Sequence, residues 1–141
     1  MNIAFFEYLM KLADYSYKNG DVPISAVIAK DGEIVSAGYN TRELTNNVLG
    51  HAEINAITEL CKRVSNWNLS GYDLYVTLKP CSMCMEVIKQ ARISNVYYLL
   101  DKPDSKKEYN KTKVWKINSE KEENLYKEIL NNFFKDIRDK S

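Results

Sequence analysis

Two short segments constrain this chain more than any other feature: His-Ala-Glu at residues 51–53 and Pro-Cys-Ser-Met-Cys at residues 80–84. Proline fits the first turn of a helix and not the middle of a strand. Cys81 and Cys84 are therefore predicted at a helix N-terminus, where a spacing of three residues puts both sulfurs on one face. His51 begins a second predicted helix. We expect the two helix N-termini to converge at one edge of a sheet, beyond the ends of neighbouring strands.

The apolar pattern predicts alternating helices and strands. Apolar spacing indicates a first helix that ends near Gly20, and Asp31-Gly32 indicates a hairpin turn. The other predicted elements are strands at 24–29, 33–39, 73–78 and 95–100, a loop at 40–49, and helices at 51–64, at 80–91 and from about 120. This order predicts an α/β fold, a sheet covered by helices with parallel pairing where a helix crosses over. We expect one domain over residues 1–141.

Composition excludes several protein classes. The 141 residues carry a net charge of +1, so any contact with nucleic acid needs a local basic patch. Three cysteines are too few for a secreted disulfide scaffold and indicate a reducing compartment. The first twenty residues contain charges and indicate an amphipathic helix, not a signal peptide or a membrane span. We expect a cytoplasmic protein without a membrane partner.

The two segments together offer a set of metal ligands. Two thiolates and one imidazole, from Cys81, Cys84 and His51, suit Zn²⁺ and not magnesium or calcium. Three protein ligands leave the fourth tetrahedral position open, as in catalytic zinc sites. We therefore expect one zinc ion per subunit.

Two other interpretations of these residues compete with a catalytic zinc. A structural Cys3His site would need Cys61, but that residue lies about 15 Å along the same predicted helix from His51. Cys61 is more consistent with a small core residue. A thioredoxin-like redox pair would leave the upstream His-x-Glu without a role.

Glu53 supplies a carboxylate that the metal does not need. Zinc lowers the pKa of a bound water to about 7, so zinc-bound hydroxide is the expected nucleophile. Glu53 is the predicted proton shuttle, the single catalytic carboxylate. Backbone amides near Cys81 are expected to help stabilise the transition state. Taken alone, Glu53 would be interpreted as a helix-start carboxylate that interacts with the dipole.

His-x-Glu followed by Pro-Cys-x-x-Cys is the signature pattern of zinc deaminases. Over residues 1–100 and the last helix, the chain resembles the cytidine deaminase superfamily, and most of all bacterial tRNA adenosine deaminases of the TadA type. The other segments that carry the resemblance are Gly-Asp-Val-Pro-Ile at 20–24, Ala-Val-Ile at 26–28, Asn40, Trp-Asn-Leu at 67–69 and Leu-Tyr-Val-Thr-Leu-Lys-Pro-Cys at 74–81.

The resemblance implies a fold, an assembly and a reaction. It implies a three-layer α/β/α fold with a mixed sheet, a homodimer, and conversion of adenosine to inosine at the wobble position of a tRNA anticodon stem-loop. The target base would have to leave its stack. By position, Ile24 would pack on the base, Asn40 would hydrogen-bond its edge, and the amide of Ala52 would add a contact.

The chain departs from the family pattern at several positions. Ser25 stands in place of Gly, Met85-Glu86 in place of small residues, and Leu99-Leu100 in place of Gly-Ala. Residues 105–111 replace a Gly-rich segment. A lysine-rich stretch from Lys106 to Lys116 includes Tyr109 and Trp115. It fits an RNA-binding stretch and a solvated loop about equally.

Three functions therefore remain open. The first is a tRNA adenosine deaminase. The second is a deaminase of a free base or nucleoside, with guanine, cytosine or adenine as the base. The third is a zinc-bearing RNA-binding module without turnover, against which the presence of Glu53 argues.

Overall fold

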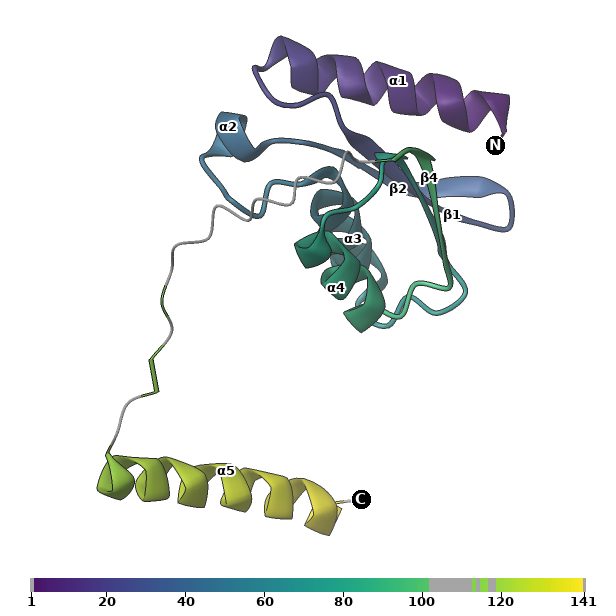
Figure 1. Cartoon of the computed structure of the whole chain (residues 1–141). Helices are drawn as coiled ribbons and strands as arrows, with labels where there is room; N and C mark the ends of the chain where they lie inside the picture. Colours follow the sequence, from purple (N-terminus) through teal and green to yellow (C-terminus); the bar gives the residue numbers. More distant parts are fainter. Residues whose placement is uncertain (1, 102–112, 114, 117–118, 141) are drawn as a thin grey trace. The chain divides into compact units, whose positions relative to one another are not determined.

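The chain consists of two compact units, Met1–Asp104 and Ser105–Ser141 (Figure 1). The computed structural model describes residues 2–101, 113, 115–116 and 119–140. Of the lysine-rich stretch, residues 106–112 and 114 lie outside the described residues. The single domain expected over residues 1–141 stays a prediction.

A mixed four-stranded sheet forms the centre of the first unit, with strand order β2-β1-β3-β4. Its strands are β1 (Ser25–Lys30), β2 (Glu33–Tyr39), β3 (Asp73–Leu78) and β4 (Asn95–Leu100). β1 pairs antiparallel with β2 and with β3, whereas β3 pairs parallel with β4. The parallel pair is the one joined by a crossover helix, as the sequence predicts.

Helices cover both faces of this sheet. α1 (Ile3–Lys18) packs on one face, and α3 (Ala52–Val64) and α4 (Ser82–Gln90) pack on the other (Figure 1). Successive side chains of β1 point to opposite faces of the sheet. Val27 packs with Leu9 and Leu12, and its neighbours Ala26 and Ile28 belong to the core beneath α3 and α4. This alternation is the period-two pattern of a strand buried on both sides. The three-layer α/β/α fold is confirmed.

The interpretation of residues 40–49 as a loop without regular structure is wrong in part. A one-turn helix, α2 (Arg42–Thr45), lies within it. It contains no buried residue, so it leaves no apolar period in the sequence. A residue outside the loop accepts hydrogen bonds from backbone amides of this helix, as described below.

The sequence predicts that the two helix N-termini follow neighbouring strands, and the sheet order differs from this prediction. The helix N-termini that carry His51 and Cys81 follow β2 and β3, which lie on either side of β1 and are not adjacent. Both strands point the same way, since each is antiparallel to β1. The two helices still begin at the same end of the sheet.

Ser25, which replaces a family glycine, is buried and satisfied. Its hydroxyl donates to the backbone oxygen of Leu9 at 2.5 Å, and its N–H donates to Thr77 Oγ1 at 3.1 Å. The side chain ties α1 to the sheet. The substitution therefore keeps the fold and adds a link between the two layers.

Gly38 in β2 marks the closest approach of α3 to the sheet. A Cβ atom there would lie 2.4 Å from the backbone oxygen of Ala52 and 2.7 Å from the backbone nitrogen of Ala56. Both atoms belong to helix backbone and cannot rotate away. The absence of a side chain at Gly38 therefore lets the first turn of α3, which follows His51, lie close against β2.

We expect Gly38→Ala to lower the free energy of unfolding by about 1 to 3 kcal/mol, the usual cost of overpacking a core. The extra methyl group must push the N-terminal turn of α3 away from β2. Urea denaturation followed by circular dichroism measures the change. An unchanged midpoint would show that α3 can retreat without loss.

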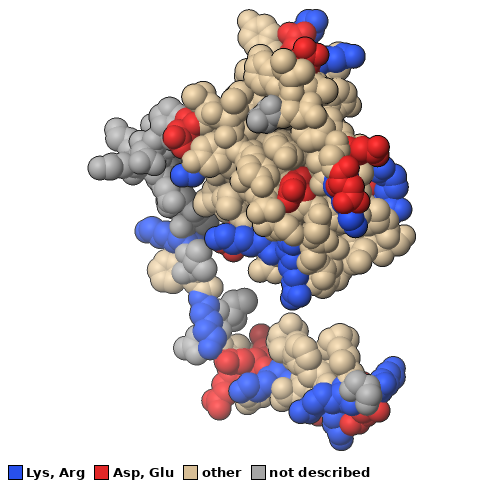
Figure 2. All heavy atoms as spheres, turned by 90° about the vertical axis from the view of Figure 1, so that its right-hand side faces the viewer, with Lys and Arg blue, Asp and Glu red and all other residues tan. Residues whose placement is uncertain are grey.

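The second unit contains α5 (Glu120–Lys140), the amphipathic helix that the sequence predicts. Phe133 and Phe134 meet edge to face with ring centroids 5.5 Å apart. Along this helix, Lys and Arg side chains are interspersed with Asp and Glu side chains (Figure 2). Within the parts of the chain that the structure describes, no helix is long and apolar enough to cross a membrane.

Candidate functional site

His51 and Cys81 each stand at the residue that precedes a helix. His51 is the N-cap of α3 and Cys81 is the N-cap of α4, and both have extended backbone angles. Neither side chain makes a capping hydrogen bond to its own helix. Both side chains are therefore available to turn toward a shared point.

The three predicted ligands do come together. His51 Nδ1 lies 3.4 Å from Cys84 Sγ and 3.8 Å from Cys81 Sγ, and the three atoms lie within 4.8 Å of one another. Ligand atoms around a tetrahedral zinc ion are about 3.5 to 3.8 Å apart, given its usual bond lengths. The cluster has the donor types and the spacing of a zinc site. It is the only cluster of at least three His, Cys, Asp or Glu ligand atoms among the described residues.

Glu53 lies beside this cluster in the first turn of α3. Its side chain is 4% exposed, which is rare for a carboxylate without a function or a close partner. Burial raises the pKa of the Cys84 thiol, and the neighbouring Glu53 charge and Cys81 raise it further. The carboxylate and the cluster therefore share one buried microenvironment, in which a cation would stabilise both thiolates.

Cys61 is absent from the cluster. α3 runs unbroken from Ala52 to Val64, so this residue lies near its far end. It packs partly buried against the main core, and burial raises the pKa of its thiol. The structure thus contradicts the structural Cys3His alternative among the described residues.

Asn40 and Ala52 meet each other at the edge of the site. Asn40 Oδ1 accepts a hydrogen bond from the Ala52 N–H at 2.9 Å, and both residues are buried. This bond occupies the Ala52 amide, which the resemblance implies as a substrate contact. It also fixes the orientation of the carboxamide, so that Nδ2 is its remaining donor. The Asn40 N–H in turn donates to the Ile24 backbone oxygen at 3.1 Å, which holds these two residues together.

A pocket opens between these residues and the candidate metal ligands. Its lining includes Ile24, Asn40, His51 and Cys81. Sequence reasoning missed several other lining residues, among them Asp21, Arg42, Glu43 and Lys79. Asp21 lies within the Gly-Asp-Val-Pro-Ile motif, so its place in that motif is the one signal that singles it out. Arg42 and Glu43 belong to α2, which carries no apolar pattern.

Comparison with curated proteins shows a relative with a named activity. The chain is 44% identical over 91 residues to a tRNA-specific adenosine deaminase of Rickettsia bellii, over 63% of this chain and 63% of the relative. The chain spans 55% to 63% of the length of this relative and of the matching Streptococcus pyogenes deaminases.

Two solved structures share the fold. A structure from work on A-to-I editing by tRNA:A34 deaminases at the wobble position matches with a TM-score of 0.70 and 37% identity, over 73% of this chain and 75% of that chain. The guanine deaminase of Bacillus subtilis matches with a TM-score of 0.77 and 26% identity, over 93% of this chain and 95% of that chain.

A sequence model of the MafB19-like deaminases matches residues 2–138. The matched residues include His51, Cys81 and Cys84, whose ligand atoms the fold brings together, and also Glu53. The chain belongs to the MafB19-like deaminase family.

Proposed function

We propose that this protein is a zinc-dependent hydrolytic deaminase that converts adenosine to inosine at the wobble position of a tRNA anticodon. The observation that carries the proposal is the gathering of His51, Cys81 and Cys84 beside the buried Glu53. Family membership supports the reaction class, and the relatives named as tRNA adenosine deaminases support the substrate.

The donor set fits one zinc ion, held by His51 Nδ1 and the two cysteine sulfurs. Zinc at these ligands would lower the pKa of water to about 7 and so supply a nucleophile at neutral pH. Glu53 would take one proton from that water and pass it to the ring nitrogen of the base. It would then take the second proton from the hydroxyl now on the ring carbon and deliver it to the amine as the carbon–nitrogen bond breaks. One carboxylate suffices because these transfers follow one another.

Asn40 and Ile24 would hold the base. With Oδ1 engaged by Ala52, Asn40 presents its Nδ2 donor to an acceptor on the base edge. Ile24 lines the same pocket and offers an apolar surface for the ring. The Ala52 amide acts here through Asn40, by setting the direction of its carboxamide. The backbone amides near Cys81 stand at a helix N-terminus, where developing negative charge is stabilised.

The decisive assay offers purified, zinc-loaded protein several substrates side by side. These are an anticodon stem-loop with adenosine at the wobble position, the same stem-loop with guanosine there, and free guanine, cytosine and adenosine. We expect inosine in the first RNA only, measured by nucleoside mass spectrometry. Ammonia released from a free base, without inosine in the RNA, would contradict the tRNA substrate.

Free guanine is the second candidate substrate. The guanine deaminase of Bacillus subtilis matches 93% of this chain, a longer stretch than the tRNA:A34 deaminase structure matches. The higher identity to tRNA deaminases, 44% against 26%, favours RNA. The stem-loop assay separates the two candidates directly.

We also propose a homodimer, a single deaminase domain and a cytoplasmic location. The family match over residues 2–138 supports the single domain. An apolar depression between α3 and α4, lined by Ile57, Trp67 and Val87 among others, supports association of two copies through this face. Light scattering after size exclusion tests the dimer. A tRNA substrate supports the cytoplasmic location.

A further inference from the structure

Residues 41–50 form a closed loop at the mouth of the pocket. The Thr41 N–H donates to the Gly50 backbone oxygen at 2.8 Å, and the Gly50 N–H donates to the Asn47 backbone oxygen at 2.8 Å. A Cβ atom on Gly50 would lie 2.7 Å from the backbone nitrogen of Arg42. Glycine is therefore required where the two ends of the loop touch. α2 lies inside this loop.

One buried carboxylate outside the loop holds α2. Asp21 is 7% exposed, and its Oδ1 accepts from the Glu43 N–H at 2.8 Å while Oδ2 accepts from the Leu44 N–H at 3.3 Å. Thr41, the N-cap of α2, makes no side-chain capping bond. Asp21 therefore replaces a local capping side chain: its carboxylate accepts hydrogen bonds from two amides that have no partner within the helix.

Asp21 is itself anchored to the residues proposed to bind the base. Its N–H donates to the Ser16 backbone oxygen at 2.9 Å, and the Ser16 hydroxyl donates to the Asn40 backbone oxygen at 3.0 Å. Ser16 is fully buried at the end of α1. The same hydrogen-bonded frame thus fixes Asn40 on one wall of the pocket and α2 on the other.

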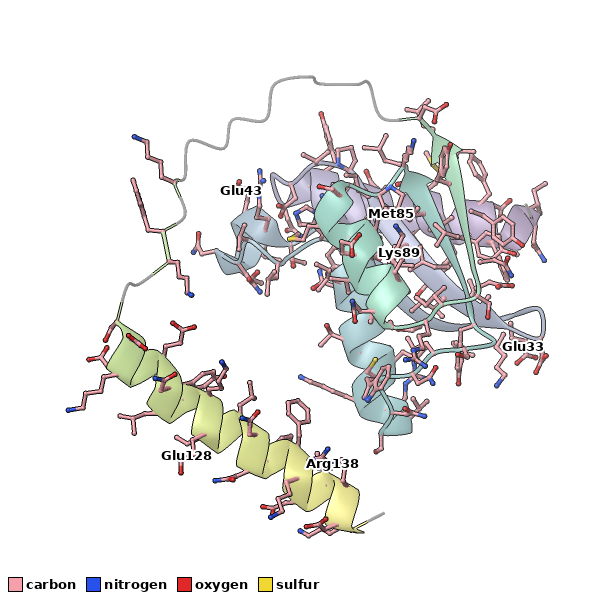
Figure 3. The ribbon with its side chains drawn as sticks, turned by 60° about the horizontal axis from the view of Figure 1, so that its bottom comes forward. Glu33, Glu43, Met85, Lys89, Glu128 and Arg138 are labelled. Carbon is pink, nitrogen blue, oxygen red and sulfur yellow. The ribbon has the colours of Figure 1, made fainter. Side chains whose placement is uncertain are left out.

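α2 contributes charged side chains to that second wall. Arg42 and Glu43 line the pocket together with Asp21, and Glu43 projects from α2 (Figure 3). Arg42 and Glu43 approach each other at 3.5 Å, and both side chains are more than half exposed. They are free to contact the part of a substrate that extends beyond the reacting base. The neutral base itself gives them no charge to bind.

We propose that Asp21 is a positioning residue that sets substrate affinity by fixing α2 as a wall of the pocket. The inference rests on the proposed deaminase function and concerns the part of the substrate outside the base. Without the Asp21 carboxylate, α2 loses two hydrogen bonds that fix its position, and the Arg42 and Glu43 side chains are no longer held at the pocket. The proposed metal ligands and Glu53 lie at the N-terminal ends of α3 and α4 and keep their positions.

The test compares Asp21→Asn with Asp21→Glu and with Asp14→Asn as a matched control. Asp14 is an exposed residue of α1 that pairs with Lys18 and lies outside the pocket. We expect Asp21→Asn to raise KM for the stem-loop about tenfold with little change in kcat, because it removes binding that the ground state and the transition state share. Asp21→Glu, which keeps the carboxylate, should have the KM of the wild type, and Asp14→Asn should leave KM unchanged.

A second measurement reports on α2 directly. In Asp21→Asn we expect faster amide hydrogen exchange at Glu43 and Leu44, with no change at Asn55 in α3. Faster exchange with an unchanged KM would overturn the inference, as would a KM increase that Asp21→Glu fails to reverse. If the wild type deaminates free guanine but not RNA, the proposed function fails separately. Free guanine has no part outside the base for α2 to contact, so a raised KM of Asp21→Asn for guanine would overturn the inference.

Discussion

Glu53→Gln is expected to lower kcat by about a thousandfold, within the range that a positioned general acid–base group contributes. The amide has the size of the carboxylate, so the first turn of α3 should keep its backbone. It cannot take a proton from water, and it cannot deliver one to the base or to the leaving amine. Steady-state assays on the stem-loop measure the loss, and metal analysis measures zinc content.

Zinc content should stay at the wild-type level, because Glu53 is not among the three clustered ligands. Glu59→Gln is the matched control on the same helix. Glu59 accepts from Arg63 Nη2 at 3.0 Å, and its side chain is about half exposed. This control should retain kcat. A Glu53→Gln variant that keeps both zinc and turnover would refute the proton-shuttle role.

The cluster of candidate metal ligands could be predicted because each half of the site is local in sequence. Cys81 and Cys84 share one helix turn, and His51 and Glu53 share another. The strand before α4 was visible from alternating apolar residues, and its observed bounds are those predicted. Only the convergence of the two halves required a fold. Helix N-termini at one end of a sheet supply that convergence even though β1 separates the strands that lead to them.

The walls of the pocket could not be predicted in the same way. Two backbone amides of α2 donate hydrogen bonds to the carboxylate of Asp21, about twenty residues earlier in the chain. Such a bond leaves no periodicity and no composition signal. The Asn40–Ala52 bond is likewise a contact between a loop and a helix start, and it occupies the amide that the resemblance assigns to the substrate.

Zinc loss is the second large expected effect. Cys84→Ser should lower zinc affinity by more than about a hundredfold, since even changes outside the ligand shell cost 10- to 100-fold. Cys84 is completely buried, so no surface residue can swing in to replace its sulfur. Deaminase activity should disappear together with the bound metal. Competition with a chromophoric chelator measures the affinity.

Cys61→Ser is the matched control, because this cysteine lies outside the ligand cluster and is bonded only loosely, with Sγ 3.9 Å from the Trp67 backbone oxygen. It should bind zinc like the wild type.

Burial and Glu53 raise the pKa of the Cys84 thiol, so zinc must displace a proton from it. Wild-type zinc affinity should therefore rise with pH between 6 and 8, by about tenfold per unit for each proton released. Cys84→Ser should show a shallower slope, since it has lost one of those protons. Equal slopes in the two proteins would mean that Cys84 does not bind the metal as a thiolate.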